Sequence, residues 1–212
     1  MTKDEELKEL EKKAWRSNFQ DGLWDIYFGL LFIGIGIYTI PQLFGFDNTF
    51  GLIMILMIWD LSSVVLFIIG KKLITIPRIG FVRFSKKRVI KKIKLTIFLS
   101  FMVGLNVVFL LLPFSGLNIK LDAFKTMLII GTLFLTLPIC VIAYFLQFER
   151  LYLIGVMGGV GLSITGLLGP IVGSPLKYVL TFCPIGSIII TWGIVIFIRF
   201  LKAYPLPKKE QA

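Results

Sequence analysis

A single carboxylate, Asp60, lies inside the apolar run MILMIWDLSSVVLFIIG, residues 54–70. It stands about ten residues into a stretch of about twenty, which places it near the bilayer midplane at about 1.5 Å of rise per residue. An aspartate at that depth costs at least about 2.5–3.5 kcal/mol on insertion scales. The apolar surroundings favour its protonated form, and we expect its side chain to face a bundle interior or a wet cavity.

Other polar side chains fall at a similar expected depth in neighbouring apolar runs. With Asp60 they predict one polar layer across the bundle, formed by Ser63, Asn106, Ser163, Thr165, Ser187 and Thr191. Pro138 and Pro184 remove backbone donors within two of these runs, and broken helices at membrane depth often line transporter sites. The pattern favours a path for protons or cations.

Two other roles for Asp60 stay open. A protonated Asp60 would fix helix packing by donating to Asn106 or to a serine, although such bonds average only about 0.6 kcal/mol in membranes. An intramembrane aspartyl hydrolase would pair Asp25 with Asp60. Carboxyls that share a proton must lie about 3 Å apart, whereas Asp25 is expected roughly 10 Å away in depth, near the membrane boundary.

The chain contains no histidine. This excludes Ser-His catalysis, His-ligated haem and the H-E-x-x-H zinc site. We assign no catalytic residue, no metal site and no cofactor, and the sequence does not point to an enzyme. Cys140 and Cys183 both fall inside apolar runs at different expected depths, so we expect free thiols.

Asp21 and Asp25 stand four residues apart, on one helical face at the start of the first apolar run. One explanation is structural, because the positive N-terminal end of a helix favours carboxylates. The functional alternative is a cytoplasmic mouth of the path, which attracts cations or pairs with the basic loop.

The elements that must hold these residues follow from composition. The 212 residues are 57% hydrophobic and 17% charged, with the charges bunched between apolar runs, whereas soluble domains carry about 25% charged residues. This predicts an all-α, polytopic integral membrane protein, a bundle of six transmembrane helices. The expected spans are residues 23–40, 50–69, 95–112, 126–146, 151–172 and 178–200. An amphipathic cytoplasmic segment (1–21) precedes this membrane domain (22–202), and a cytoplasmic tail (203–212) follows it.

Lysine and arginine give the orientation. Of the 23 Lys and Arg residues, 20 fall on the side that holds both termini and the 71–94 loop. The positive-inside rule places that side in the cytoplasm, in the cell membrane. The net charge of +11 has the same origin, so we expect no nucleic acid as a partner.

The 71–94 loop is the main extramembrane feature. β-forming residues on both sides of Pro77 and Gly80 predict a small hairpin. Its cations would contact anionic lipid headgroups, at roughly 1 kcal/mol each; a soluble acidic partner is the alternative ligand. They are Lys71, Lys72, Arg78, Arg83, Lys86, Lys87, Arg88, Lys91, Lys92 and Lys94.

Packing signals are sparse. Gly155 and Gly159 have the G-x-x-x-G spacing, which predicts close helix packing. Trp59 and Trp192 lie deep in their runs, and we expect both to pack between helices.

The sequence indicates a small transporter or channel-like permease that moves protons, cations or a small solute through Asp60. Six short spans enclose little space, so a homodimer is expected for this function. The alternative is a non-catalytic membrane subunit or scaffold that docks a partner through the basic loop.

Overall fold

The computed structural model describes residues 19–46, 48–79, 93, 97–98, 100–101 and 122–205. Within these residues all regular structure is helical, and five helices are long and apolar enough to cross a membrane. They are Leu23–Phe44, Thr49–Arg78, Phe124–Leu146, Arg150–Val172 and Leu176–Ala203. The prediction of an all-helical, multi-pass membrane protein is confirmed at this level. Most of the amphipathic segment, most of the third expected span and most of the tail lie outside the described residues.

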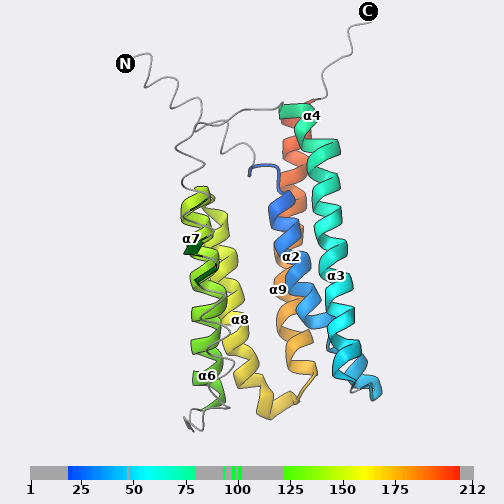
Figure 1. Cartoon of the computed structure of the whole chain (residues 1–212), viewed down its shortest axis with the longest axis vertical. Coiled ribbons are helices and arrows are strands. Elements are labelled where there is room, and N and C mark those ends of the chain that lie inside the picture. The colour runs from blue at the N-terminus through cyan, green and yellow to red at the C-terminus, as the bar shows by residue number, and fades with distance from the viewer. Residues whose placement is uncertain are drawn as a thin grey trace, which may run out of the picture. The chain divides into compact units, whose positions relative to one another are not determined.

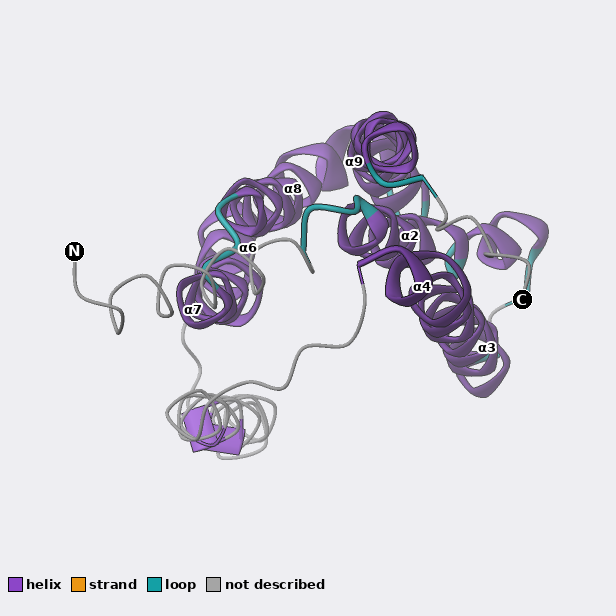
Figure 2. Cartoon of the chain, turned by 90° about the horizontal axis from the view of Figure 1, so that it is seen from above, coloured by secondary structure: helices purple, strands orange, loops and turns teal. Residues whose placement is uncertain are grey.

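The chain divides into two compact units, one formed by Met1–Arg83 with Cys183–Ala212 and the other by Phe84–Phe182. In the first unit α2 (Leu23–Ile37) lies between α3 (Thr49–Gly70) and the part of α9 (Leu176–Ala203) that follows Phe182, as Figures 1 and 2 show. In the second unit α6 (Ala123–Ile130) and α7 (Leu137–Leu146) pack against α8 (Arg150–Val172).

Helix ends follow local sequence signals. Asn48 caps α3 by accepting a hydrogen bond from the Phe50 N–H at 3.2 Å. Asp21 accepts from the Leu23 N–H at 3.2 Å, just before α2. At the other end of α2, Pro41 lies in the short 3₁₀ helix Ile40–Phe44. Proline cannot donate the next helical hydrogen bond, so it turns the chain there.

The second span extends beyond its predicted end at Ile69. α3 continues through a π-helical segment, Lys71–Thr75, into α4 (Ile76–Ile79). The first half of the predicted hairpin is therefore helical, and its second half lies outside the described residues. Contacts of this extension with the start of α2 explain the difference: Gly70 packs against Leu23 and Lys71 bonds to Asp21. Such tertiary contacts override the strand propensity of isoleucine and threonine.

A π-helical segment precedes a proline twice in the described chain. Lys71–Thr75 comes directly before Ile76-Pro77, and Gly131–Thr136 comes directly before Leu137-Pro138. A proline ring clashes with the carbonyl four residues earlier and leaves it without a donor. A wider π turn relieves this conflict while the helix continues. The distortion expected at Pro138 is thus a widened turn within a continuous helix.

Glycines set the contact between α2 and α9. A Cβ atom added to Gly29 would lie 2.8 Å from the Gly186 carbonyl oxygen, and one added to Gly186 would lie 2.6 Å from the Gly29 oxygen. Seven residues away in each segment, a Cβ atom on Gly22 would clash with the Gly193 carbonyl oxygen, and one on Gly193 would lie 2.9 Å from the Ile26 backbone nitrogen. The two backbones therefore touch in antiparallel packing, and a side chain at any of these four positions would separate them.

The G-x-x-x-G prediction for α8 is confirmed. A Cβ atom on Gly155 would lie 3.0 Å from Ile139 Cγ2, and one on Gly159 would clash with the Thr136 side chain. Thr136 Oγ1 also donates to the Gly155 carbonyl at 3.1 Å. The small residues thus allow α8 to approach the helix that runs from α6 through α7.

Candidate functional site

Asp60 lies near the middle of α3, at the edge of the face that meets α2. A Cβ atom on Gly34 would lie 3.5 Å from Asp60 Oδ1 and 2.6 Å from Trp59 Cδ1, so the absence of a side chain at Gly34 makes room for both residues. Trp59 Nε1 donates to the Leu30 carbonyl at 2.8 Å. This bond confirms that Trp59 packs between helices and fixes the rotation of α3 beside α2.

The Asp60 side chain is partly exposed. Ile58 and Leu61, two residues before Asp60 and one residue after it, are 65% and 66% exposed. Their apolar side chains are suited to contact with lipid or with a partner helix. Asp60 therefore sits at the border between the α2–α3 interface and the outer surface of α3.

The predicted polar layer is divided between the two units. Hydroxyls of this set donate to carbonyls of their own helices: Ser63 to Trp59, Ser163 to Gly159, Thr165 to Leu162 and Thr191 to Ser187. Ser187 and Thr191 are exposed, Ser163 and Thr165 belong to the other unit, and Asn106 lies outside the described residues. Only Ser63, which is 3% exposed, shares the α2-facing side of α3 with Asp60.

The structure separates the two carboxylates of the hydrolase hypothesis. Asp60 is level with Gly34 on α2. Asp25 lies nine residues before Gly34 on the same helix, which corresponds to about 13 Å along the axis. A pair that shares a proton needs a separation of about 3 Å, so Asp25 and Asp60 do not form such a dyad.

A buried polar cluster, the Asp21 cluster (Asp21, Lys71 and Thr75), joins the start of α2 to the end of α3. Lys71 Nζ lies 2.6 Å from Asp21 Oδ2, and Thr75 Oγ1 donates to the same oxygen at 2.6 Å. Asp21 is 0% exposed and the Lys71 side chain 14% exposed. The salt bridge is thus shielded from water. Salt bridges that are exposed to water contribute little to stability.

Asp25 is also buried, on the side of α2 that meets α9. It is 1% exposed, and a Cβ atom on Gly193 would lie 3.0 Å from Asp25 Cβ. Both acidic residues predicted at the mouth are therefore enclosed by side chains.

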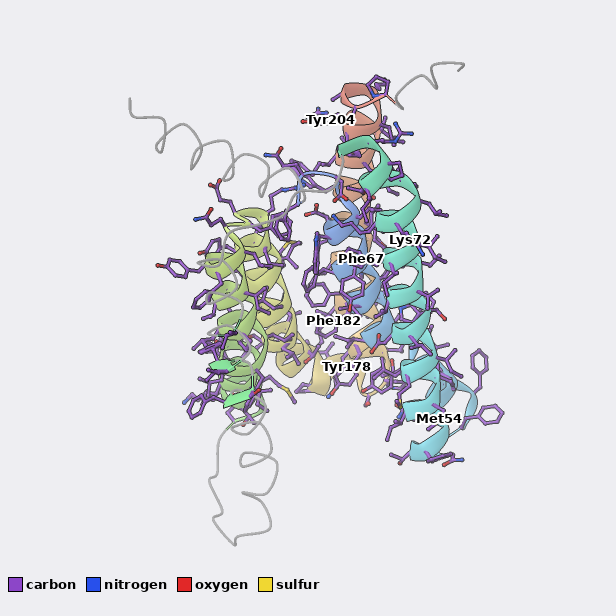
Figure 3. All side chains as sticks on the ribbon, turned by 45° about the horizontal axis from the view of Figure 1, so that its top comes forward. Met54, Phe67, Lys72, Tyr178, Phe182 and Tyr204 are labelled. Carbon is purple, nitrogen blue, oxygen red and sulfur yellow. The ribbon has the colours of Figure 1, made fainter. Side chains whose placement is uncertain are left out.

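Three cations of the basic loop are described. Lys71 bonds to Asp21, and the Arg78 guanidinium donates to the carbonyls of Tyr204 at 2.8 Å and Leu201 at 3.5 Å. Arg78 thereby caps the C-terminal end of α9, where carbonyls lack helical partners. Lys72 is exposed, in the π-helical segment that continues α3 (Figure 3). The remaining predicted contacts, Arg83, Lys86, Lys87, Arg88, Lys91, Lys92 and Lys94, lie outside the described residues.

Comparison of the chain with protein-family models, with curated proteins and with solved structures found no match. Its function must be argued from its own residues. Among the described residues, no group of three or more His, Cys, Asp or Glu side chains could hold a metal ion. Cys140 and Cys183 are free thiols, as expected.

Sequence reasoning missed the aromatic layer, formed by Trp24, Tyr27 and Phe67, that lies between Asp60 and the Asp21 cluster. The Phe67 ring centre lies 4.6 Å from that of Trp24 and 5.3 Å from that of Tyr27. Lys71 Nζ, which belongs to the Asp21 cluster, lies 5.8 Å from the Phe67 ring centre. The sequence held a signal for this position: Phe67 follows Asp60 by seven residues and precedes Lys71 by four, a spacing that places the three residues on one helical face.

Proposed function

We propose that this protein is a small permease of the cell membrane, with both termini in the cytoplasm, that moves protons or cations through Asp60. The observation that carries the proposal is the position of Asp60. A carboxylate in the middle of an apolar helix stands beside Gly34, at a partly exposed position. Ionisable groups at this depth are costly and usually belong to ion or proton pathways.

A purely structural role for Asp60 has less support. No hydrogen bond joins the carboxylate to another side chain among the described residues, and the hydroxyl of Ser63 is already bonded to the Trp59 carbonyl. The α2–α3 contact has other anchors, such as the Trp59–Leu30 bond. A group that costs energy to bury and that is left at a partly exposed position fits exchange of a proton or cation better than fixed packing.

The test uses purified protein in liposomes that contain a pH-sensitive dye, with a potassium gradient and valinomycin to set the voltage. We expect proton flux for the wild type and its loss in Asp60→Asn and Asp60→Leu. Parallel assays with sodium and potassium as the moving ion cover the cation alternative. Ser62→Ala is the matched control, because Ser62 is exposed on the same helix and bonds only to the Ile58 carbonyl among the described residues.

Absence of flux of all three ions in folded wild-type protein would overturn the proposal, as would full flux in Asp60→Asn. Full flux in Asp60→Asn would mean that transport does not use Asp60, whereas absence of flux would favour the alternative of a non-catalytic membrane subunit. In that case the exposed Lys72 and the basic residues that follow it would be the contact with anionic lipid or with an acidic partner.

A further inference from the structure

The segment that follows α3, residues 71–79, connects the ends of three helices of the first unit, and we call it the strap. Its first half is bonded to the start of α2, where Lys71 Nζ lies 2.6 Å from Asp21 Oδ2 and Thr75 Oγ1 donates to the same oxygen at 2.6 Å. Asp21 is 0% exposed, so water does not compete for these bonds. Breaking a buried ion pair leaves a charge without a partner, which makes the attachment to α2 the firm one.

The second half of the strap, α4, is held to the end of α9 by one side chain. Arg78 Nη1 donates to the Tyr204 carbonyl at 2.8 Å and to the Leu201 carbonyl at 3.5 Å, and Figure 1 shows α4 beside the last turns of α9. Both acceptors are neutral, and Tyr204 is 41% exposed. Water replaces such bonds at a lower cost than it replaces a buried ion pair. The strap therefore detaches from α9 before it detaches from α2.

A point of bending lies between the two attachments. In the π-helical turn the Ile76 N–H donates to the Lys71 carbonyl, five residues back. The next residue, Pro77, has no N–H to donate, so α4 is joined to the preceding turn by fewer hydrogen bonds than an ordinary helix. Helices bend at prolines and at π turns. α4 can thus tilt away from α9 while the bonds to Asp21 remain.

The donors of Arg78 are incompletely used in this arrangement. Its Nε atom is buried and donates to no acceptor among the described residues. A buried N–H group without an acceptor is costly. A guanidinium satisfies its donors best on a carboxylate or phosphate, which accepts two parallel hydrogen bonds at once. The unused donor therefore points to an anion as the better ligand of Arg78.

The surface around Arg78 is cationic. Other exposed cations lie at this end of the first unit: Lys72, Arg199 and Lys202. The described carboxylates of the unit offer them no partner on that surface, because Asp21 and Asp25 are 0% and 1% exposed and Asp60 lies in the middle of α3. The positive-inside rule places this end at the cytoplasmic leaflet. Its charge is complementary to the anionic lipid headgroups of such a leaflet.

We propose that the phosphate of an anionic phospholipid binds Arg78 and thereby releases the strap from α9. The phosphate carries a formal charge and makes stronger bonds to a guanidinium than neutral carbonyls do. It takes the donors that now hold Tyr204 and Leu201, so lipid binding and the closed strap exclude each other. The attachment to α2 persists, because Asp21 is buried and already paired with Lys71. This inference does not depend on the proposed transport.

The test compares the full chain in nanodiscs of phosphatidylcholine with the same nanodiscs containing phosphatidylglycerol. Amide hydrogen exchange, read by mass spectrometry, reports local opening in the peptides of residues 76–79 and 200–204, with residues 23–37 as the internal reference. We expect phosphatidylglycerol to raise exchange in the first two peptides by about tenfold or more, since losing hydrogen bonds worth about 1.4 kcal/mol in total raises the open fraction tenfold. Exchange in the reference peptide should not change.

Two variants assign the effect to Arg78. Arg78→Gln should exchange rapidly at both ends of the contact in either lipid, and phosphatidylglycerol should add nothing. Lys72→Gln is the matched control, because Lys72 is an exposed cation of the same strap, and it should respond to the lipid as the wild type does. Arg78→Lys serves if Arg78→Gln does not fold: it keeps the charge without the planar fork, and its lipid response should be weaker than that of the wild type.

The other outcomes would overturn the proposal. Equal exchange of the wild type in the two lipids means that no lipid releases the strap. An undiminished response in Arg78→Gln or Arg78→Lys, or a lost response in Lys72→Gln, assigns the effect to surface charge in general. Faster exchange in the reference peptide as well means that the lipid loosens the whole unit. If glycerol phosphate added to phosphatidylcholine nanodiscs has the same effect, the ligand is a soluble phosphate and not a lipid.

Discussion

The Asp21 cluster allows a sharp prediction of stability. Asp21→Ala removes an acceptor that is 0% exposed and that serves Lys71, Thr75 and the Leu23 N–H. The Lys71 charge is then left in a site where its side chain is 14% exposed. Breaking one side of a buried ion pair typically costs about 3–5 kcal/mol. We expect Asp21→Ala to lower the free energy of unfolding by about that amount.

The assay is reversible unfolding in mixed micelles, read as the loss of helical circular dichroism. Lys72→Ala is the matched control, because it removes an exposed lysine next to Lys71 and should change stability by no more than about 0.5 kcal/mol. The double variant Asp21→Leu with Lys71→Met should regain most of the loss, since it leaves no unpaired charge. A cost for Asp21→Ala no larger than that of Lys72→Ala would refute the reasoning, as would a double variant that is less stable than Asp21→Ala.

Two further predictions concern helix packing in the separate units. Trp59→Phe should destabilise the first unit by about 1 kcal/mol, because the hydrogen bond from the indole to the Leu30 carbonyl is lost. Trp192→Phe, at a residue 62% exposed, should be neutral in the same unfolding assay, and equal effects would contradict the role of the bond. Gly159→Leu should cost about 1–3 kcal/mol or more, because a Cβ there already meets the Thr136 side chain. The control is Val160→Leu, at a residue 51% exposed, and a stable Gly159→Leu variant would show that α8 is not closely packed.

The helical spans could be predicted because apolar length is a direct property of the sequence. The span expected at 151–172 is α8, Arg150–Val172, and the one at 126–146 is the helix Phe124–Leu146. The length of an apolar run does not predict that a helix continues beyond it, where polar contacts hold the helix. This is why the second span was predicted to end at Ile69, while bonds of Lys71 and Thr75 to Asp21 hold the helical extension.

Side-chain direction was harder to predict than depth. Trp192 was expected between helices and is 62% exposed, and Thr191 was expected in a polar layer and bonds to the Ser187 carbonyl. A hydroxyl in an apolar helix can satisfy itself on its own backbone, so depth alone does not select its partner. The glycines at 22, 29, 186 and 193 did not enter the prediction, although their seven-residue spacing marks the faces on which α2 and α9 touch.

The Asp21–Lys71 pair is informative because it is a poor way to stabilise a helix pair. Apolar residues of similar volume would hold the two helices about as well, and they would avoid the cost of removing two charges from water. The pair holds the helical extension to the start of α2, and a second role in transport can be separated from this one. The double variant Asp21→Leu with Lys71→Met separates the two roles. If it is folded and stable but moves neither protons nor cations, the pair serves transport; if its flux equals that of the wild type, the pair serves only to hold the two helices.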